Sequence, residues 1–223
     1  MATASDRNQQ RVADSLMTMF FSFDGIDGAG KSTQMDMFCE WLRKQGCDVV
    51  TCRDPGCTPL GEQIREILLH SDERTPIGSR SEMLLYMAAR AQLVDEVIRP
   101  ALEANKVVVS DRYLLANLAY QGHAGGLQVD VVRHVGEVAI DGVRPDCVFL
   151  LDISLQEAHR RLDRSLDRME QRGDDYRQRL RDGFLAEAAR PDSHIHVIDA
   201  GRPVPQVQAD IQQIAAGLLP KAK

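Results

Sequence analysis

The sequence lacks paired cysteine motifs, a surplus of basic charge and long apolar runs, and each absence argues against a class of protein. Five cysteines in 223 residues, with no CxxC pair, argue against a disulfide framework or a cysteine-bound metal cluster. The net charge of −6 is the opposite of the basic surplus typical of broad nucleic-acid binding. No apolar run approaches the roughly 20 residues of a membrane span. The polar residues 1–16 contain no secretory apolar region. We therefore expect a cytoplasmic protein with reduced thiols and without nucleic-acid or membrane partners.

The remaining composition is ordinary for a globular protein, with 43% hydrophobic and 27% charged residues. A chain of 223 residues is long enough for one domain with a full hydrophobic core. Residues 1–16 are predicted to be a flexible N-terminal extension, and residues 17–219 a single domain. No internal repeat, low-complexity tract or clear interdomain linker interrupts that domain.

Short apolar runs alternate with amphipathic segments along the domain. Strands are predicted at 17–23, 48–52, 106–110, 147–152 and 194–199. Helices are predicted at 31–45, 60–70, 81–104, 111–122, 129–140, 154–164 and 203–218. One more helix is predicted to follow the arginine-rich stretch 160–172 and to end at about residue 189. Pro100 is expected to kink or break its helix, and Gly122 to end its helix before a loop at 123–127. Because continuously apolar strands alternate with helices, the pattern favours an α/β fold with a parallel sheet covered on both faces.

Residues 25–32, GIDGAGKS, complete the phosphate-binding pattern G-x-x-x-x-G-K-[ST] between a predicted strand and a predicted helix. The glycines let the backbone wrap closely around phosphates, and the helix N-terminus directs its positive dipole at the anion. Lys31 is expected to reach the β- and γ-phosphates of ATP, and the Ser32 hydroxyl to bind Mg²⁺. The predicted ATP contacts are Gly25, Ile26, Asp27, Gly28, Ala29, Gly30, Lys31, Ser32 and Thr33. This loop alone fits a kinase, a GTPase-type switch or a motor.

Four further stretches narrow the choice: CRDPGCTPLGEQIR (52–65), LLYMAARAQ (84–92), SDRYLLANLAYQG (110–122) and RRLDRSLDRME (160–170). Arg53 follows one predicted strand, and Asp111 and Arg112 follow another. Ligands of open parallel sheets bind outside the carboxyl ends of the strands, so these side chains and the loop should face one crevice. Tyr86 and Arg90 are four residues apart and share a helix face.

In order and spacing these stretches resemble the thymidylate kinase family from about Met19 to Ile211. The matching family patterns are F-E-G-x-D-G-A-G-K-S-T-Q, R-E-P-G-G-T-P-L-G-E, L-L-x-F-x-A-x-R, D-R-Y…A-Y-Q-G and D-R-x-E. The resemblance implies a doubly wound five-stranded sheet of the nucleoside-monophosphate kinase type, a small arginine-rich lid at about 160–172, and a homodimer. It also implies transfer of a phosphoryl group from ATP to dTMP, with Mg²⁺.

The implied acceptor is itself a phosphate, whose second pKa is about 6, so it needs no dedicated general base. The reaction calls instead for cations that hold two anions together and stabilise the transferred group. By resemblance, Arg53 and Arg112 clamp the dTMP phosphate, and Asp27 contacts its 3′-hydroxyl or phosphate region. Asp111 holds Mg²⁺ through water or fixes Arg112. For Arg53 and Arg112, ordinary exposed salt bridges are the alternative interpretation.

The resemblance also assigns residues to the nucleoside part of dTMP. Arg90 hydrogen-bonds the thymine, and Tyr86 stacks on it, although core packing explains Tyr86 equally well. Asn117 and Gln121 also contact the base. Tyr120 packs where a ribose 2′-hydroxyl would lie, which favours deoxyribose.

The phosphate-binding loop contains no arginine, so by resemblance the catalytic cation comes from the lid, as in the bacterial type. The lid contains Arg160, Arg161, Arg164 and Arg168. Arg161 and Arg164 are the favoured candidates, and Arg168 is assigned to lid closure; a solvated basic helix face is the alternative. The predicted catalytic residues are Asp27, Lys31, Arg112, Arg161 and Arg164.

Several positions depart from the family patterns. Asp54 replaces glutamate and Cys57 replaces glycine, so Cys57 is strained if its φ is positive. Ala116 stands where serine is common, and His123 is predicted to lie on the surface.

Two alternative functions stay open: a related kinase of another nucleotide or a nucleoside, and a nucleotide-dependent switch protein. A nucleoside kinase needs a base to activate a hydroxyl, and a switch needs a water-positioning residue and a loop ordered by the γ-phosphate.

Overall fold

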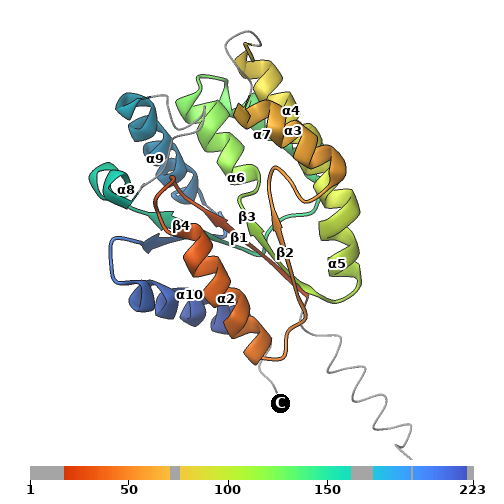
Figure 1. The fold of residues 1–223 in the computed structure, drawn as a ribbon, viewed down its shortest axis with the longest axis vertical. Coiled ribbons are helices and arrows are strands. Elements are labelled where there is room, and N and C mark those ends of the chain that lie inside the picture. The colour runs from red at the N-terminus through yellow and green to blue at the C-terminus, as the bar shows by residue number, and fades with distance from the viewer. Residues whose placement is uncertain (1–17, 71–75, 162–172, 192, 220–223) are drawn as a thin grey trace, which may run out of the picture.

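A computed structural model of the chain describes residues 18–70, 76–161, 173–191 and 193–219 (Figure 1). The predicted N-terminal extension and most of the predicted lid, residues 162–172, lie outside these ranges. Within them, five strands form one parallel sheet in the order β2-β3-β1-β4-β5. The strands are β1 (Met19–Asp24), β2 (Val49–Arg53), β3 (Val107–Asp111), β4 (Cys147–Asp152) and β5 (Ile195–Asp199). Because β1 lies in the middle and successive crossovers lead to both sides of it, the sheet is doubly wound, as predicted.

Helices cover both faces of the sheet. Figure 1 shows α2 and α10 on one face and α6 and α9 on the other. α4 shares a core cluster with Phe20 and Val108 of the sheet, and it contacts α3 and α7. The α-helices are α2 (Lys31–Lys44), α3 (Pro59–His70), α4 (Ser79–Leu93), α5 (Arg99–Glu103), α6 (Leu114–Asn117), α7 (Val129–Ile140), α8 (Leu155–Arg161), α9 (Asp174–Ala188) and α10 (Val204–Leu218). Two π-helical segments, η1 (Val94–Ile98) and η2 (Leu118–Ala124), continue α4 and α6. None of the described helices is long and apolar enough to cross a membrane.

The regular α-helical pattern is interrupted just before Pro100, as predicted, because η1 separates α4 from α5 and Pro100 falls in the first turn of α5, where its missing N–H group is tolerated. One predicted helix boundary is wrong. Gly122 does not stop the second helix, which continues as η2 through Ala124. Gly122 is instead a packing position: a Cβ atom there would lie 3.2 Å from Cγ2 of Val129.

The register of the central strands determines where the site lies. Asp111 of β3 pairs with Phe23 of β1 on one side and with Arg53 of β2 on the other. The three strands therefore end at the same level, and the segments that follow them leave the sheet side by side. This places the loop after β1 next to the ends of β2 and β3. The ends of the strands thus meet where ligands of open parallel sheets bind, outside the carboxyl ends of the strands, a regularity called the crevice rule below.

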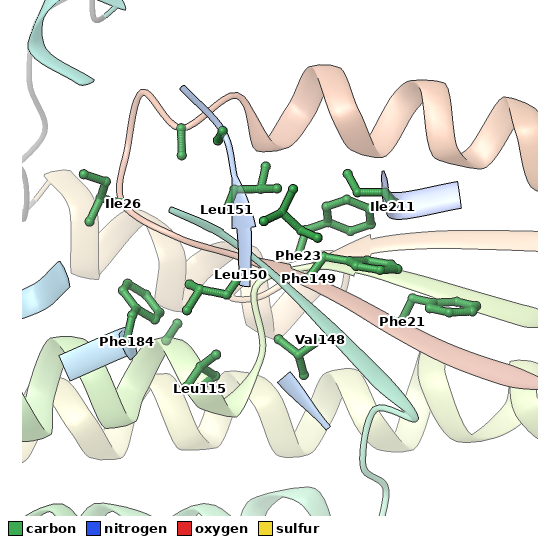
Figure 2. Packing of buried hydrophobic residues seen from close by; sticks show 14 of the residues in the cluster. Phe21, Phe23, Ile26, Leu115, Val148, Phe149, Leu150, Leu151, Phe184 and Ile211 are labelled. Atoms are coloured by element: carbon green, nitrogen blue, oxygen red, sulfur yellow. The ribbon is translucent and has the colours of Figure 1, made fainter. Parts of the chain in front are cut away.

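The few aromatic residues of this chain are concentrated around β1. Phe21, Phe23 and Phe149 pack with Phe38 of α2, with ring centroids 5.1–5.9 Å apart. Figure 2 shows these strand phenylalanines on the side of the sheet that carries Ile211, and Val148 on the side that carries Leu115 and Phe184. Since successive side chains of a strand point to opposite faces, β1 and β4 are buried on both. That core fixes the point at which β1 ends and the phosphate-binding loop begins.

Candidate active site

The loop between β1 and α2 needs glycine at two positions for close approach to other elements. A Cβ atom on Gly25 (φ 135°) would lie 2.4 Å from the carbonyl oxygen of Leu151 on β4. A Cβ atom on Gly28 (φ 85°) would lie 2.6 Å from that of Ala158 on α8. The loop is therefore pressed between β4 and α8, with the free N–H groups of the first turn of α2 at its end, which is the arrangement of an anion site.

Lys31 begins α2 and is buried, with its ammonium turned back onto the loop. Its Nζ donates to the carbonyl oxygens of Gly25 at 3.1 Å and Ile26 at 3.2 Å, and lies 3.4 Å from Oδ1 of Asp27. Burial lowers the pKa of Lys31, and the nearby positive charge of Arg112 lowers it further. A buried ammonium of this kind gains from any anion that enters the loop.

Arg112, Asp27 and Tyr120 form one cluster at the floor of the site. Nη2 of Arg112 donates to Oδ1 of Asp27 at 2.5 Å, and its Nη1 donates to the carbonyl oxygen of Gly25 at 3.1 Å. The hydroxyl of Tyr120 donates to Oδ2 of Asp27 at 3.1 Å, and the Tyr120 ring lies 5.0 Å from the Arg112 guanidinium carbon. Burial alone would raise the pKa of Asp27, but Arg112 and Lys31 outweigh it and hold that pKa well below its usual range. Asp27 is therefore a carboxylate that orients Arg112.

The backbone of Arg112 adopts the left-handed region, with φ 67°. Its N–H donates to the carbonyl oxygen of Phe23 at 2.9 Å, and its own carbonyl oxygen accepts from the Ser110 hydroxyl at 2.7 Å. These two contacts hold a conformation that costs about 1–3 kcal/mol in a non-glycine residue, a kind of strain that clusters at functional sites. In this backbone conformation the Arg112 side chain reaches the loop, where its guanidinium contacts Gly25 and Asp27.

Arg90 of α4 is 1% exposed and is held from several sides. Its Nε lies 2.5 Å from Oδ2 of Asp54, and its Nη2 donates to the carbonyl oxygen of Tyr113 at 3.2 Å. The guanidinium carbon also lies 5.3 Å from the centroid of the Tyr113 ring. Burial raises the pKa of Asp54, and Arg90 opposes that rise. The position that departs from the family's glutamate thus supplies the buried partner of the predicted base-binding arginine.

Arg53 is exposed at the end of β2, and Glu62 of α3 holds it through both carboxylate oxygens, at 3.0 and 2.9 Å. The Cys57 backbone N–H donates to the same carboxylate at 2.7 Å, and this bond, followed by Arg53, lowers the pKa of Glu62. Cys57 has φ 62°, so the condition for strain at this position is met. Of these residues, Arg53 lines the cavity described below, and Glu62 holds it there from outside the lining.

Asn117 and Gln121 are almost completely buried and hydrogen-bonded to each other and to α4. Nδ2 of Asn117 donates to Oε1 of Gln121 at 2.7 Å, and Nε2 of Gln121 donates to Oε1 of Glu82 at 2.9 Å. Tyr86 lies one turn beyond Glu82 and is partly buried against Leu68 and its neighbours. Tyr86 packs on this cluster, as the packing interpretation expects, and it also lines the cavity described next, so stacking on a base stays a prediction.

A single cavity of about 920 Å³ joins these features. Its lining includes the loop residues from Asp27 to Thr33, the predicted metal residue Asp111 and all seven predicted dTMP contacts outside the loop. Those seven are Arg53, Tyr86, Arg90, Arg112, Asn117, Tyr120 and Gln121. Gly25 and Ile26, two predicted ATP contacts, do not line it; their carbonyl oxygens accept hydrogen bonds from Lys31. A phosphate-binding loop and an acceptor pocket thus share one space.

The sequence matches the family model for thymidylate kinase over residues 23–211. The chain belongs to the thymidylate kinase family. It is 41% identical over 206 residues to the thymidylate kinase of Symbiobacterium thermophilum, covering 92% of this chain and 96% of that protein. It is 43% identical over 202 residues to that of Bifidobacterium longum subsp. infantis, covering 88% and 87%. A crystal structure of thymidylate kinase from Ehrlichia chaffeensis resembles it with a TM-score of 0.70 at 30% identity, over 88% of this chain and 98% of that one. These likenesses confirm the predicted family, enzyme class and fold.

Of the four arginines in the predicted lid of this thymidylate kinase-like chain, the structure describes two. Arg161 lines the cavity from the end of α8, and its Nε lies 3.0 Å from Oε1 of Glu157. Arg160 also pairs with Glu157, but its side chain is 69% exposed and does not line the cavity. Arg164 and Arg168 lie outside the described residues.

Further residues of this member of the thymidylate kinase family line the cavity without having been predicted, among them two groups on other elements. Arg65 and Leu69 of α3 line the cavity, as does the segment after β5. That segment contributes Ala200, Gly201, Arg202, Pro203, Val204 and Val207. The crevice rule, applied to the end of β5 as it was to β2 and β3, would have found the second group.

Asp24, the last residue of β1, was also missed. Its carboxylate is fully buried, and among the described residues neither oxygen has a hydrogen-bond partner. Burial raises the pKa of Asp24 to about 7, although Arg112 and Lys31 act to lower it. The polar end of the otherwise apolar stretch MFFSFD was the indication available in the sequence.

His123, predicted to lie on the surface, reaches it only in part, with its side chain 27% exposed. It lies in η2, with Nε2 2.9 Å from Oε1 of the buried Glu187 on α9. Arg133 of α7 contacts the same carboxylate at 2.7 Å. A Cβ atom on Gly183 would lie 2.5 Å from Cβ of His123, so the helices approach closely here. Because α9 is distant in sequence from residue 123, no local pattern could indicate this pairing.

Proposed function

We propose that this chain transfers the γ-phosphoryl group of ATP to dTMP, giving ADP and dTDP. The observation that carries the proposal is the single cavity that contains both the phosphate-binding loop and the acceptor-site residues. Membership of the thymidylate kinase family supports the same reaction. Direct transfer between two phosphates requires the donor and the acceptor in one space. A simple hydrolase would need the phosphate-binding loop but not the acceptor-site residues.

On the donor side, Lys31 and the N–H groups that open α2 would bind the ATP phosphates. The residues present fit Mg²⁺: Ser32 and Asp111 line the same cavity, and Oδ1 of Asp111 is buried without a hydrogen-bond partner among the described residues. No group of three or more acidic, histidine or cysteine residues in the described ranges could hold a metal alone, so Mg²⁺ would be shared with the nucleotide. When bound, it would neutralise charge on the β- and γ-phosphates.

On the acceptor side, Arg112 and Arg53 would bind the dTMP phosphate. Each is already held by a carboxylate, Asp27 and Glu62 respectively, so little reorganisation is needed when the phosphate arrives. The paired arginines suit the fork geometry of phosphate recognition. Asp27 would also accept from the 3′-hydroxyl of dTMP. The dTMP phosphate attacks directly, while Arg161 and Arg164 stabilise the charge of the transferred group.

The nucleoside would lie against the buried wall of the cavity. Arg90 would donate to the base, Asn117 and Gln121 would contact its edge, and Tyr86 would stack on its face. Tyr120 is fixed by its hydroxyl on Asp27, which supports its role beside C2′ of the sugar, where it would disfavour a ribose.

The state of Asp27 argues against a nucleoside acceptor. Activation of a neutral hydroxyl requires a base whose pKa is near the working pH. Arg112 and Lys31 keep the pKa of Asp27 well below its usual range, against the effect of burial, so it is a weak base. The phosphate of a nucleotide acceptor is already ionised and does not need a general base.

The test is phosphorylation of four acceptors by purified protein with Mg-ATP. We expect dTMP to be used far better than dCMP, UMP or AMP. Equal turnover of all four would exclude the thymidylate assignment. Rapid ATP hydrolysis without any acceptor would favour the nucleotide-dependent switch instead.

We also propose a homodimer in the cytoplasm. Side chains of α3, α4 and α7, helices that pack together, leave apolar surface exposed: Ile67 45%, Leu84 53%, Val131 47% and Val138 81%. A Val138→Asp variant should sediment as a monomer if this face forms the interface, and a wild-type monomer at micromolar concentration would exclude the dimer.

The five free cysteines suit a reducing compartment, which supports the cytoplasm as the location. Cell fractionation against a cytosolic marker would check it.

A further inference from the structure

Three buried side chains behind the acceptor pocket form a hydrogen-bonded relay that links α4 to α6 and η2. Glu82, Gln121 and Asn117 are 1%, 1% and 2% exposed. Glu82 accepts from Nε2 of Gln121 at 2.9 Å, and Oε1 of Gln121 accepts from Nδ2 of Asn117 at 2.7 Å. Oδ1 of Asn117 has no hydrogen-bond partner among the described residues. The relay therefore ends, at a residue that lines the cavity, on an unused acceptor.

The direction of this relay follows from its first member. A carboxylate only accepts hydrogen bonds, whereas an amide can turn either its oxygen or its nitrogen toward a partner. Glu82 therefore requires Gln121 to present its NH₂ group, which turns the Gln121 oxygen toward Asn117. Asn117 must then present its own NH₂ group to that oxygen, and its Oδ1 is left over.

Reversing Asn117 alone would place its oxygen against the oxygen of Gln121. Reversing both amides would place the Gln121 oxygen against the Glu82 carboxylate. In either case a buried hydrogen bond is replaced by two acceptor oxygens that face each other. This raises the free energy of the reversed arrangement, because buried acceptors without a donor cannot turn to water instead. The polarity of Asn117 is thus fixed by a residue that is absent from the cavity lining.

We propose that Glu82 is a positioning residue that, through Gln121, holds Asn117 as a hydrogen-bond acceptor and so selects bases that carry an N3–H donor. The proposal rests on the proposed function, since it concerns the base of the acceptor nucleotide. Thymine and uracil have a donor at N3, and cytosine has an acceptor there. A locked acceptor at Asn117 rejects cytosine, whereas a freely reversible amide would accept both.

The decisive variant is Glu82→Gln, which keeps the shape of residue 82 but lets it donate or accept. A glutamine at position 82 can accept from Gln121 or donate to it, so the reversed relay is no longer excluded. We expect kcat/KM for dCMP to rise relative to that for dTMP, so that the dTMP/dCMP ratio falls about tenfold, the effect of one hydrogen bond. The ratio should stay above one, because the donors of Arg90 still disfavour the amino group of cytosine. The dTMP/dUMP ratio should not change, since both bases carry N3–H.

The matched control is the exchange variant Glu82→Gln with Gln121→Glu. The new amide at position 82 can donate to the new carboxylate at position 121. That carboxylate can only accept from Asn117, so the original direction is restored. We expect the dTMP/dCMP ratio to return to within about threefold of wild type, a difference of less than about 0.7 kcal/mol. A role of Glu82 in packing alone would not predict recovery when a second buried residue is changed.

Each outcome decides a separate question. If the wild-type protein does not phosphorylate dTMP, the proposed function fails, whatever the variants do. If it does, and folded Glu82→Gln keeps the wild-type ratio, or the exchange variant fails to restore it, the relay is refuted. Should Glu82→Gln fail to fold in a thermal melt, the exchange variant decides by itself: wild-type discrimination supports the relay, and lost discrimination overturns it.

Discussion

Replacing Asp24 by asparagine should change how the stability of this protein depends on pH. The Asp24 carboxyl group is fully buried at the end of β1, and no described residue hydrogen-bonds either oxygen. Burial raises its pKa from 3.8 to about 7, against the lowering effect of Arg112 and Lys31. The group is therefore protonated in the folded protein over a range in which it is ionised in the unfolded chain.

The sign and size of the effect follow from linkage. Between about pH 4 and pH 7 the folded state binds one proton more than the unfolded state at Asp24, so the free energy of unfolding falls as the pH rises. Each pKa unit corresponds to about 1.4 kcal/mol, so the full window corresponds to about 4 kcal/mol. Roughly two of the three units lie between pH 5 and pH 7. Because the folded group is already half ionised at pH 7, Asp24 should reduce stability by about 2 kcal/mol over that interval and by nearer 3 kcal/mol by pH 8.

The assay is urea unfolding of wild type and Asp24→Asn at pH 5, 6, 7 and 8, in EDTA to exclude metal binding. Asparagine has the same shape and no charge, so the difference between the two proteins isolates Asp24 from the other titrating groups. We expect wild type to lose about 3 kcal/mol relative to the variant between pH 5 and pH 8. A difference that is constant within about 0.5 kcal/mol across this range would refute the burial argument, since that is the error of such extrapolations.

Three other substitutions test separate parts of the site. Arg112→Ala should lower kcat/KM for dTMP by about 100-fold or more, because it removes a charge-assisted fork, while ATP binding in equilibrium titrations stays nearly intact; loss of ATP binding alone would contradict its assigned role. Arg161→Ala and Arg164→Ala should each lower kcat by about tenfold or more with a modest change in dTMP binding, measured by steady-state kinetics. Wild-type kcat in both would mean that the lid does not supply the catalytic cation. Cys57→Gly should raise the free energy of unfolding by about 1 kcal/mol, because it relieves the backbone at φ 62°, and Cys57→Ser should not. Equal stability of the two variants in urea would show that this turn is not strained.

The crevice rule predicted much of the site because strand ends can be located from apolar runs. Arg53, Asp111 and Arg112 follow such runs, and the parallel register brings them to one edge beside the loop. The partners of these residues could not be predicted in the same way. Arg90 and Asp54 are 36 positions apart, and Arg112 and Asp27 are 85 positions apart. A hydrogen bond depends on distances of a few tenths of an ångström, and periodicity carries no such information.

Local sequence patterns were enough to predict the phosphate-binding loop, the order of strands and helices along the chain, and the arginines at strand ends. Each of these depends on neighbouring residues: glycine spacing, runs of apolar side chains, and residue types at strand ends. The charge state of a group and the direction of its hydrogen bonds follow only from the packed structure. Asp24 and Asp27 are close neighbours along the chain, yet burial raises the pKa of the first, while Arg112 and Lys31 lower that of the second despite its burial. Charge and hydrogen-bond polarity depend on the whole surroundings of a group, which are complete only when distant segments have packed together.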